Sequence, residues 1–341
     1  MCWVVDASIH VVTANKTPRL NIWYIQKDIN GPPLSSLLAS PHPCRLAYIQ
    51  QVNMSSILQA DVYVSSRLPI AMKRMGETSY FSPISCTLIH GDSEAVLVDT
   101  PISISQTEGL AAWIKKTAPG KSLRYVYITH GHGDHWFGIS ILRKHWPNLR
   151  ALATPGTVEH MNEQIKPEIL EGTWHALFPG GQIPQSLEPA KPMDSLTFSL
   201  EGHEFRAIEV GHTDTYNTTV LHVPSIRLVV AGDAVYGDVH QFFGEANTKE
   251  KRQEWLRALD KIEALDPHTV IAGHKREGTV DGLFNLHRTR QYILDFEDAV
   301  AKASNWKDLA GDIQRRYPRR INPHAILRGA MAAFPPVSSK V

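Results

Sequence analysis

The chain has 341 residues, 43% of them hydrophobic, and its 35 basic and 34 acidic residues leave a formal net charge of +1. This length and apolar content fit one large domain with a core of its own, and the balanced charge excludes a global field that recruits nucleic acid or an anionic membrane. No apolar run approaches the roughly 18 residues needed to cross a bilayer, the start lacks a secretory pattern, and the scattered cysteines (Cys2, Cys44 and Cys86) favour reduced thiols in a cytoplasmic protein.

The first part of the chain differs from the rest. Residues 31–43 are rich in Pro and Ser and have no sustained period, which is typical of a loop or a disordered arm. From Met54 the sequence runs smoothly into alternating and apolar segments. We therefore expect residues 1–53 to form a disordered extension and the folded domain to cover residues 54–290.

Beyond residue 81, strand patterns and helix patterns alternate. The predicted strands are 86–90, 95–99, 123–129, 151–153, 196–200, 204–210, 218–223, 227–231 and 268–272; the predicted helices are 108–117, 134–145 and 249–265. Residues 156–195 combine short helical pieces with a Gly/Pro-rich loop, which predicts a lid or pocket wall. The tail is helical, and residues 291–341 should pack on the domain. Two groups of strands with interspersed helices predict two sheets packed face to face and covered by helices.

Four metal-binding side chains follow directly on the predicted strand 123–129. His130, His132, Asp134 and His135 stand within six positions, with glycines between the first three. Alternate residues of an extended segment point the same way, so His130 and His132 are placed to bind one metal together. Asp134 and His135 lie where the chain turns towards a helix and are placed to bind a second metal. Imidazole and carboxylate ligands without a thiolate suit catalytic zinc.

This cluster resembles the signature of the metallo-β-lactamase superfamily, and the later motifs of that family follow in order. Gly211-His212-Thr213, Ala231-Gly232-Asp233 and Ala272-Gly273-His274 each stand at the end of a predicted strand, and Asp99 closes another. The resemblance implies an αββα sandwich, with two mixed sheets packed face to face and helices on both outer faces. It also implies two Zn²⁺ per chain, with His130, His132 and His212 on the first, Asp134, His135 and His274 on the second, Asp233 bridging both, and Asp99 orienting the ligand histidines.

The same resemblance implies a zinc-dependent hydrolase in which a metal-bridging hydroxide attacks a carbonyl carbon. Asp134 would orient the hydroxide and pass a proton towards the leaving group. Tyr236, three positions after Asp233, resembles a tyrosine of lactone-opening members that lies near the substrate carbonyl. We therefore expect catalytic roles for Asp134 and Tyr236, and the opening of a small cyclic amide or ester in detoxification or secondary metabolism.

Several further side chains bear on the substrate. Aromatic residues on loops predicted around the mouth favour a small organic ring or acyl group over a sugar or a polyphosphate. His240 follows Asp233 closely and is a further candidate on a loop facing the site. The dense basic run at 315–320 is typical of a solvated face, so we expect a small-molecule substrate and neither a nucleic acid nor a membrane partner. The aromatic candidates are Trp136, Phe137, Trp174, Phe178, Phe242 and Phe243.

Three alternatives stay open. Acyl thioesterases of the glyoxalase II-like and polyketide types resemble the first cluster, but they usually have Gly-Gly soon after its last histidine, where this chain has Trp136-Phe137-Gly138. Iron-dependent sulfur dioxygenases keep the histidines, whereas oxygen-reducing di-iron members usually have a carboxylate at the position of His132. A non-catalytic binding protein on this fold would be expected to have lost ligands, yet all seven candidate positions are present.

Overall fold

The computed structural model describes residues 57–74 and 77–335, so the expected extension over residues 1–53 lies outside the described residues. The strands are β1 (Gln59–Val64), β2 (Leu68–Arg74), β3 (Glu77–Phe81), β4 (Ser85–His90), β5 (Glu94–Val98), β6 (Ser122–Tyr127), β7 (Arg150–Ala153), β8 (Lys191–Pro192), β9 (Thr197–Leu200), β10 (His203–Gly211), β11 (Thr218–Val223), β12 (Leu228–Val230) and β13 (Thr269–Ile271). The α-helices are α1 (Ile104–Thr117), α2 (Ile139–His145), α3 (Pro155–Gln164), α4 (Pro167–Ile169), α5 (Lys249–Glu263), α6 (Phe284–Lys302), α7 (Trp306–Arg316) and α8 (Pro323–Ala333).

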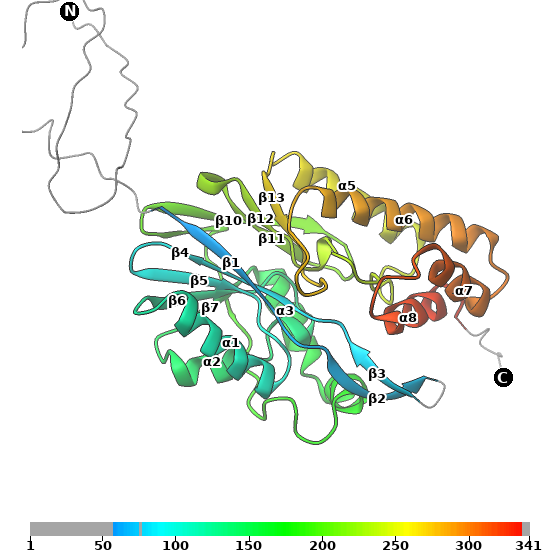
Figure 1. Ribbon diagram of the computed structural model, residues 1–341, viewed down its shortest axis with the longest axis horizontal. Helices are drawn as coiled ribbons and strands as arrows, with labels where there is room; N and C mark the ends of the chain where they lie inside the picture. Colours follow the sequence, from blue (N-terminus) through cyan, green and yellow to red (C-terminus); the bar gives the residue numbers. More distant parts are fainter. Residues whose placement is uncertain (1–56, 75–76, 336–341) are drawn as a thin grey trace, which may run out of the picture. The chain divides into compact units, whose positions relative to one another are not determined.

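Two mixed sheets form the centre of the domain (Figure 1). The first has the order β1-β4-β5-β6-β7-β8 and is parallel from β5 onward. The second has the order β13-β12-β11-β10-β9, and only β12 and β13 pair in parallel. Strands β2 and β3 make a separate antiparallel hairpin. Because strands far apart in the sequence become neighbours, the loops that follow them converge.

Alternation along the strands divides the core into three layers. Val96 and Val98 of β5 face the space between the sheets, where they join Val230 and Ile271 of the second sheet. Leu97 points the other way and packs with Leu110 and Ile114 of α1, so β5 is buried on both faces and reads as a continuous apolar run.

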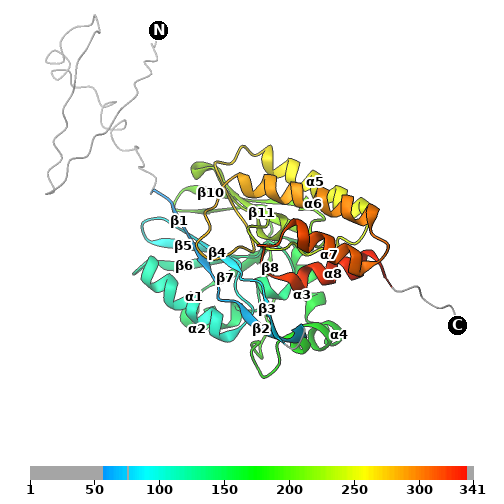
Figure 2. The ribbon, with the colours of Figure 1, turned by 45° about the vertical axis from the view of Figure 1, so that its right-hand side comes forward.

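The outer face of the second sheet is covered in the same manner. Val229 of β12 and Val270 of β13 pack with Trp255 and Leu259 of α5. Figures 1 and 2 show α1 and α2 on one side of the two sheets and α5 and α6 on the other. The predicted αββα sandwich is confirmed.

The predicted helix over residues 134–145 is wrong in its first third. A single helical turn covers Gly133–His135, and α2 begins only at Ile139. Trp136 explains the break, because its indole Nε1 donates to the carbonyl of Gly131 at 2.8 Å and its ring is fully buried. The backbone amide of Gly138 then donates to the Thr100 hydroxyl at 3.0 Å, which directs the chain into α2. The metal motif therefore sits on a tight turn rather than on a continuous helix.

Two regions of the chain lie outside the two sheets. Residues 155–181 form α3, α4, a π-helical turn (Leu170–His175) and a loop with Gly180 and Gly181 in positive φ. At the other end of the chain, α6, α7 and α8 pack on one another and on the second sheet. None of the helices within residues 57–335 is both long enough and apolar enough to cross a bilayer.

Candidate metal centre

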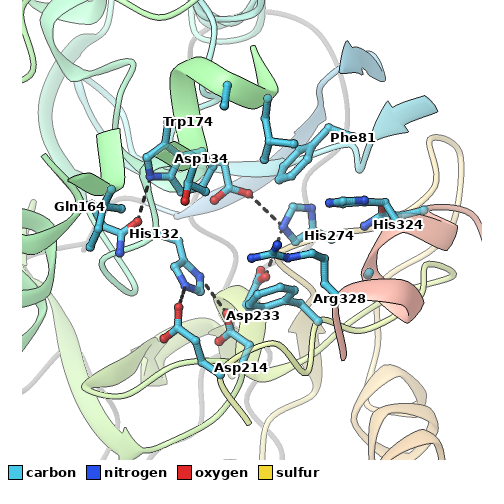
Figure 3. A pocket seen from close by; sticks show the side chains of 18 of the residues that line it. Phe81, His132, Asp134, Gln164, Trp174, Asp214, Asp233, His274, His324 and Arg328 are labelled. Atoms are coloured by element: carbon cyan, nitrogen blue, oxygen red, sulfur yellow. Dashed lines mark hydrogen bonds and ion pairs between the residues drawn. The ribbon is translucent and has the colours of Figure 1, made fainter. Parts of the chain in front are cut away.

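The residues that could hold a metal follow the ends of strands from both sheets. Residues 130–135 come after β6, Asp214 after β10, Asp233 after β12 and His274 after β13. These strand ends meet at one edge of the sandwich, so side chains separated by up to 144 positions in the printed sequence become neighbours there. Figure 3 shows His132, Asp134, Asp214, Asp233 and His274 converging on a single cavity.

One half of the centre holds the residues that the motifs predict. Asp134, His135 and His274 form one group of potential ligand atoms. Asp233 joins them, with Oδ1 at 3.2 Å from His135 Nε2 and Oδ2 at 3.2 Å from His274 Nε2. A Cβ at position 273 would lie 2.3 Å from Asp233 Oδ1, so Gly273 is needed for β13 to approach this carboxylate.

The other half contains His130, His132 and Asp214. Asp214 Oδ2 lies 3.0 Å from His132 Nδ1 and 3.7 Å from His130 Nε2. Asp233 is also within reach, because His130, His135 and Asp233 make up a further group of potential ligand atoms. This half thus offers two imidazoles and a carboxylate. Asp233 lies between it and the half that contains Asp134, His135 and His274.

His212 belongs to none of the groups of potential ligand atoms found among the described residues. Its Nδ1 faces the carbonyl of Thr213 at 2.9 Å, and its backbone amide donates to Glu254 Oε1 at 3.2 Å. Two positions later, Asp214 is fully buried and accepts a hydrogen bond from the Thr213 hydroxyl at 2.9 Å. The loop after β10 thus turns the histidine away and the carboxylate inward, and the place expected for His212 is taken by Asp214.

Hydrogen bonds on the far side of each ring decide which nitrogen faces the centre. His135 Nδ1 lies 2.9 Å from Asp99 Oδ2, and His274 Nδ1 lies 2.8 Å from the carbonyl of Pro83, which leaves both Nε2 atoms for the centre. His132 is reversed, since its Nε2 lies 3.0 Å from Glu245 Oε1 and its Nδ1 faces Asp214. Such outer partners fix the tautomer and orientation of metal-binding histidines.

Asp99 has the orienting position that the resemblance implies, whereas Glu245 and Asp214 were not predicted. Glu245 is 113 positions from His132 in the sequence and belongs to no motif. Asp214 adjoins the Gly211-His212-Thr213 motif, but a sequence pattern alone cannot rank two ligand-type side chains on one loop.

The cluster fits a metal by its unsatisfied atoms. Within the described residues, His130 Nε2, His135 Nε2, Asp214 Oδ2 and Asp233 Oδ1 are buried and have no hydrogen-bond partner. Buried polar atoms are nearly always satisfied, and an ion is one of the recognised explanations when they are not. The nitrogen and oxygen donors, with no sulfur among them, suit Zn²⁺ and other divalent transition metals.

Charge in the cluster favours a cation. Burial opposes charge on the His135 ring, yet Asp233, Asp134 and Asp99 hold its pKa well above the usual value. In the same way, Asp233 and Asp134 overcome burial and raise the pKa of His274 to about 9. The pKa of Asp233 is held well below its usual value, because His274 and His135 outweigh the effect of burial. Positive charge therefore stabilises these buried carboxylates, and metal ions would supply it.

An adjoining cavity of about 440 Å³ opens onto both halves. Residues 164–177 line one wall, the β2–β3 hairpin another and α8 a third. Of the six predicted aromatic residues, Trp174 and Phe242 line the cavity. The other four are core residues with at most 1% of their surface exposed: Trp136, Phe137, Phe178 and Phe243.

Two further candidates are placed differently from expectation. Tyr236 lines the cavity, but its hydroxyl donates to Asp233 Oδ2 at 2.5 Å. Burial, together with Asp233, raises the pKa of Tyr236 well above its usual value, so the hydroxyl keeps its proton at neutral pH. His240 does not face the cavity, because it is buried with Nδ1 at 2.8 Å from the hydroxyl of Tyr292 in α6.

Known proteins are similar to this chain. A curated relative from Bacteroides fragilis, named "Metallo-beta-lactamase type 2", is 22% identical over 64% of this chain and 79% of its own. A Bacillus subtilis protein named YobT is 24% identical over 56% of this chain and 83% of its own. The solved metallo-beta-lactamase from Pontibacter korlensis has the same fold, with a TM-score of 0.51 at 18% identity over 70% of this chain and all of its own. The family model described as "Metallo-beta-lactamase superfamily" matches residues 79–274. The chain belongs to the metallo-beta-lactamase superfamily.

Proposed function

We propose that this protein is a dinuclear zinc hydrolase that opens a small cyclic amide or ester. The observation that carries the proposal is the convergence of unsatisfied imidazole and carboxylate atoms on a cavity with apolar walls. In this proposal one metal is held by His130, His132 and Asp214, the other by Asp134, His135 and His274, and Asp233 contacts both. The name of the Bacteroides relative places lactams first among the ring compounds to be tested.

The metals would supply Lewis acidity, which lowers the pKa of a bound water and polarises a carbonyl oxygen. The chain's own residues do the rest. Asp134 lines the cavity with 4% of its surface exposed, so its carboxylate is placed to take a proton from the attacking water and return it to the leaving nitrogen or oxygen. Phe81, Trp174 and Phe242 pack the apolar part of the substrate and exclude water from the reacting carbonyl.

Tyr236 enters the proposal as a positioning residue. Its hydroxyl donates to Asp233, so it holds the carboxylate that both metals would share. A contact with the substrate carbonyl requires that this hydroxyl turn from Asp233 to the cavity that it lines.

Acyl thioester hydrolysis is the second candidate. A Tyr236 hydroxyl that pointed at the substrate would favour a lactone over a thioester. The hydroxyl instead donates to Asp233, so this argument for a lactone is weakened. An apolar cavity with one acid–base carboxylate accepts the acyl part of a thioester equally well.

The test is metal content combined with turnover of the full chain on a panel of lactams, lactones and acyl thioesters. We expect zinc to bind and one ring class to be hydrolysed. His132→Ala should lose both zinc and turnover, whereas the control His268→Ala removes an exposed histidine and should change neither. Full turnover with two zinc ions in His132→Ala would refute the assignment. No hydrolysis of any panel member, together with bound iron, would favour the sulfur dioxygenase alternative.

A further inference from the structure

The cavity has one wall that lies outside the part of the chain matched to the family. Helix α8 follows residue 274 by almost fifty positions, and it packs against α7 and β3. Asn322, His324, Ala325 and Arg328 of this region line the cavity. Figure 3 shows the side chains of Arg328 and His324 pointing into the cavity beside His274 and Asp233.

Arg328, an exposed residue of α8, differs from the arginines of the C-terminal helices that pair with acids. Arg316 pairs with Asp298 at 2.7 Å and Arg290 with Asp260 at 2.6 Å. Arg328 has no ion pair or hydrogen bond with any residue in the described ranges 57–74 and 77–335, although the surrounding helices are rich in acids. A guanidinium offers five donors in a planar fork that matches a carboxylate, and here that fork is available to a ligand in the cavity.

The charge of the metal-loaded cavity supports an anionic ligand. Its acidic lining residues are Asp134, Asp214, Asp233 and Glu245, and its only arginine or lysine among the described residues is Arg328. Divalent cations would offset the four carboxylates, which would leave Arg328 as the cationic side chain that faces a ligand. His324 stays neutral, because burial and Arg328 lower its pKa to about 4. An anionic group of the ligand therefore has Arg328 as its side-chain partner in this wall.

The opposite walls of the cavity are apolar. Met72 and Phe81 come from the β2–β3 hairpin, and Ile169, Trp174 and Leu177 come from the segment after α3. A ligand that fills this space therefore needs an apolar body between the cationic end at Arg328 and the cluster around Asp233.

We propose that Arg328 binds a carboxylate of the substrate, so that the enzyme acts on small organic acids with an apolar body and discriminates against their neutral analogues. The inference rests on the proposed hydrolase function, because it calls the ligand a substrate, but binding of the carboxylate to Arg328 does not require turnover. A bidentate guanidinium–carboxylate contact is made in the ground state as well as in the transition state, so its loss should raise KM and leave kcat nearly unchanged.

Two measurements on the metal-loaded full chain test this proposal. The first is calorimetric binding of phenylacetate and of its neutral analogue phenylacetamide. The second is KM and kcat for a penam carboxylic acid and for the same compound with its acid converted to the carboxamide. The variants are Arg328→Gln, Arg328→Lys and the matched control Arg257→Gln, which removes an exposed arginine of α5 outside the cavity.

We expect wild type and Arg257→Gln to prefer the acid of each pair by about tenfold, the size of one charged hydrogen-bonded contact. Arg328→Gln should abolish this preference through KM, and Arg328→Lys should restore part of it. A preference that survives in Arg328→Gln, or a wild type that does not discriminate, overturns the inference. If the protein hydrolyses the penam and Arg328→Gln behaves as Arg257→Gln does, the hydrolase function holds and the role of Arg328 is wrong. If the protein binds phenylacetate through Arg328 but hydrolyses no compound, the role of Arg328 holds and the hydrolase function is wrong.

Discussion

Each half of the metal centre holds two imidazoles and one carboxylate, but only one half consists entirely of residues that the motifs predict. Asp134, His135 and His274 occupy the half that the strand-end motifs predict. In the other half, His130 and His132 are joined by Asp214 rather than by His212. The comparison shows that a motif at a strand end locates the loop, whereas hydrogen bonds within the loop decide which of its side chains turns inward.

The difference also changes the chemistry of the centre. Replacing an imidazole by a carboxylate makes one half harder and more negative, with Asp214 and Asp233 both within reach of His130. Carboxylate-rich sites accept manganese and iron more readily than sites of three imidazoles do. Both halves then hold two imidazoles and one carboxylate beside Asp233, so we expect similar metal preferences in the two, and the variants below separate their occupancy.

Removing the shared residue should have the largest effect, because it breaks both halves at once. Asp233→Ala leaves His135 and His274 without the carboxylate that lies 3.2 Å from each. We expect both metals to be lost and turnover to fall at least roughly a thousandfold. Metal analysis after gel filtration, together with initial rates, checks this.

Asp194→Asn, at an exposed position, is the control for a lost carboxylate and should match wild type. If Asp233→Ala kept one full metal equivalent, the halves would be independent, and Asp233 would belong to only one of them.

The second prediction tests the half that departs from the motif. Asp214→Ala should lose one metal and reduce turnover by more than about a hundredfold, since a direct ligand matters more than its outer partners. His212→Ala should keep both metals, because His212 belongs to none of the groups of potential ligand atoms found among the described residues. Titration of each apo-variant with zinc checks the stoichiometry. The opposite ranking of the two variants would restore His212 as the ligand.

Much of this site was predictable because its chemistry is local. The spacing of His130, His132, Asp134 and His135 fixes their grouping over six positions, and the apolar run before them places them at a strand end. Part of the layered core was also predictable, since β5 is buried on both faces and its residues 95–98 form an apolar run.

The remaining features depend on contacts between distant segments, for which a single sequence has no signal. Glu245 reaches His132 only because the segment after β12 meets the turn after β6. Trp136 and Phe243 looked like pocket aromatics but fill the core, because aromatic composition does not reveal which face of a loop is inside. The hairpin of β2 and β3 and the pocket wall of α8 were not anticipated for the same reason.

The third prediction concerns the outer partner of the half that contains Asp214. Glu245→Gln keeps the shape of the side chain but weakens the charged contact that directs His132 Nε2 outward. We expect the affinity for one metal to fall about tenfold to a hundredfold, the usual range for such partners, while the other metal stays bound. Competition with a chelator measures the two affinities separately. Equal weakening of both sites would show that Glu245 acts on the charge of the whole cavity and not on one ring.

The smallest expected effect falls on the residue that contacts both the shared carboxylate and the cavity. Tyr236→Phe removes only the hydroxyl that donates to Asp233 Oδ2 at 2.5 Å and keeps the buried ring. If Tyr236 acts by positioning Asp233, metal affinity should fall about threefold to tenfold, the size of one hydrogen bond, and kcat at saturating metal should change little. If its hydroxyl instead meets the substrate carbonyl, kcat should fall while metal affinity holds. We expect the first pattern, because the hydrogen bond that a substrate carbonyl would need is already donated to Asp233. The rates with and without added zinc distinguish the two patterns.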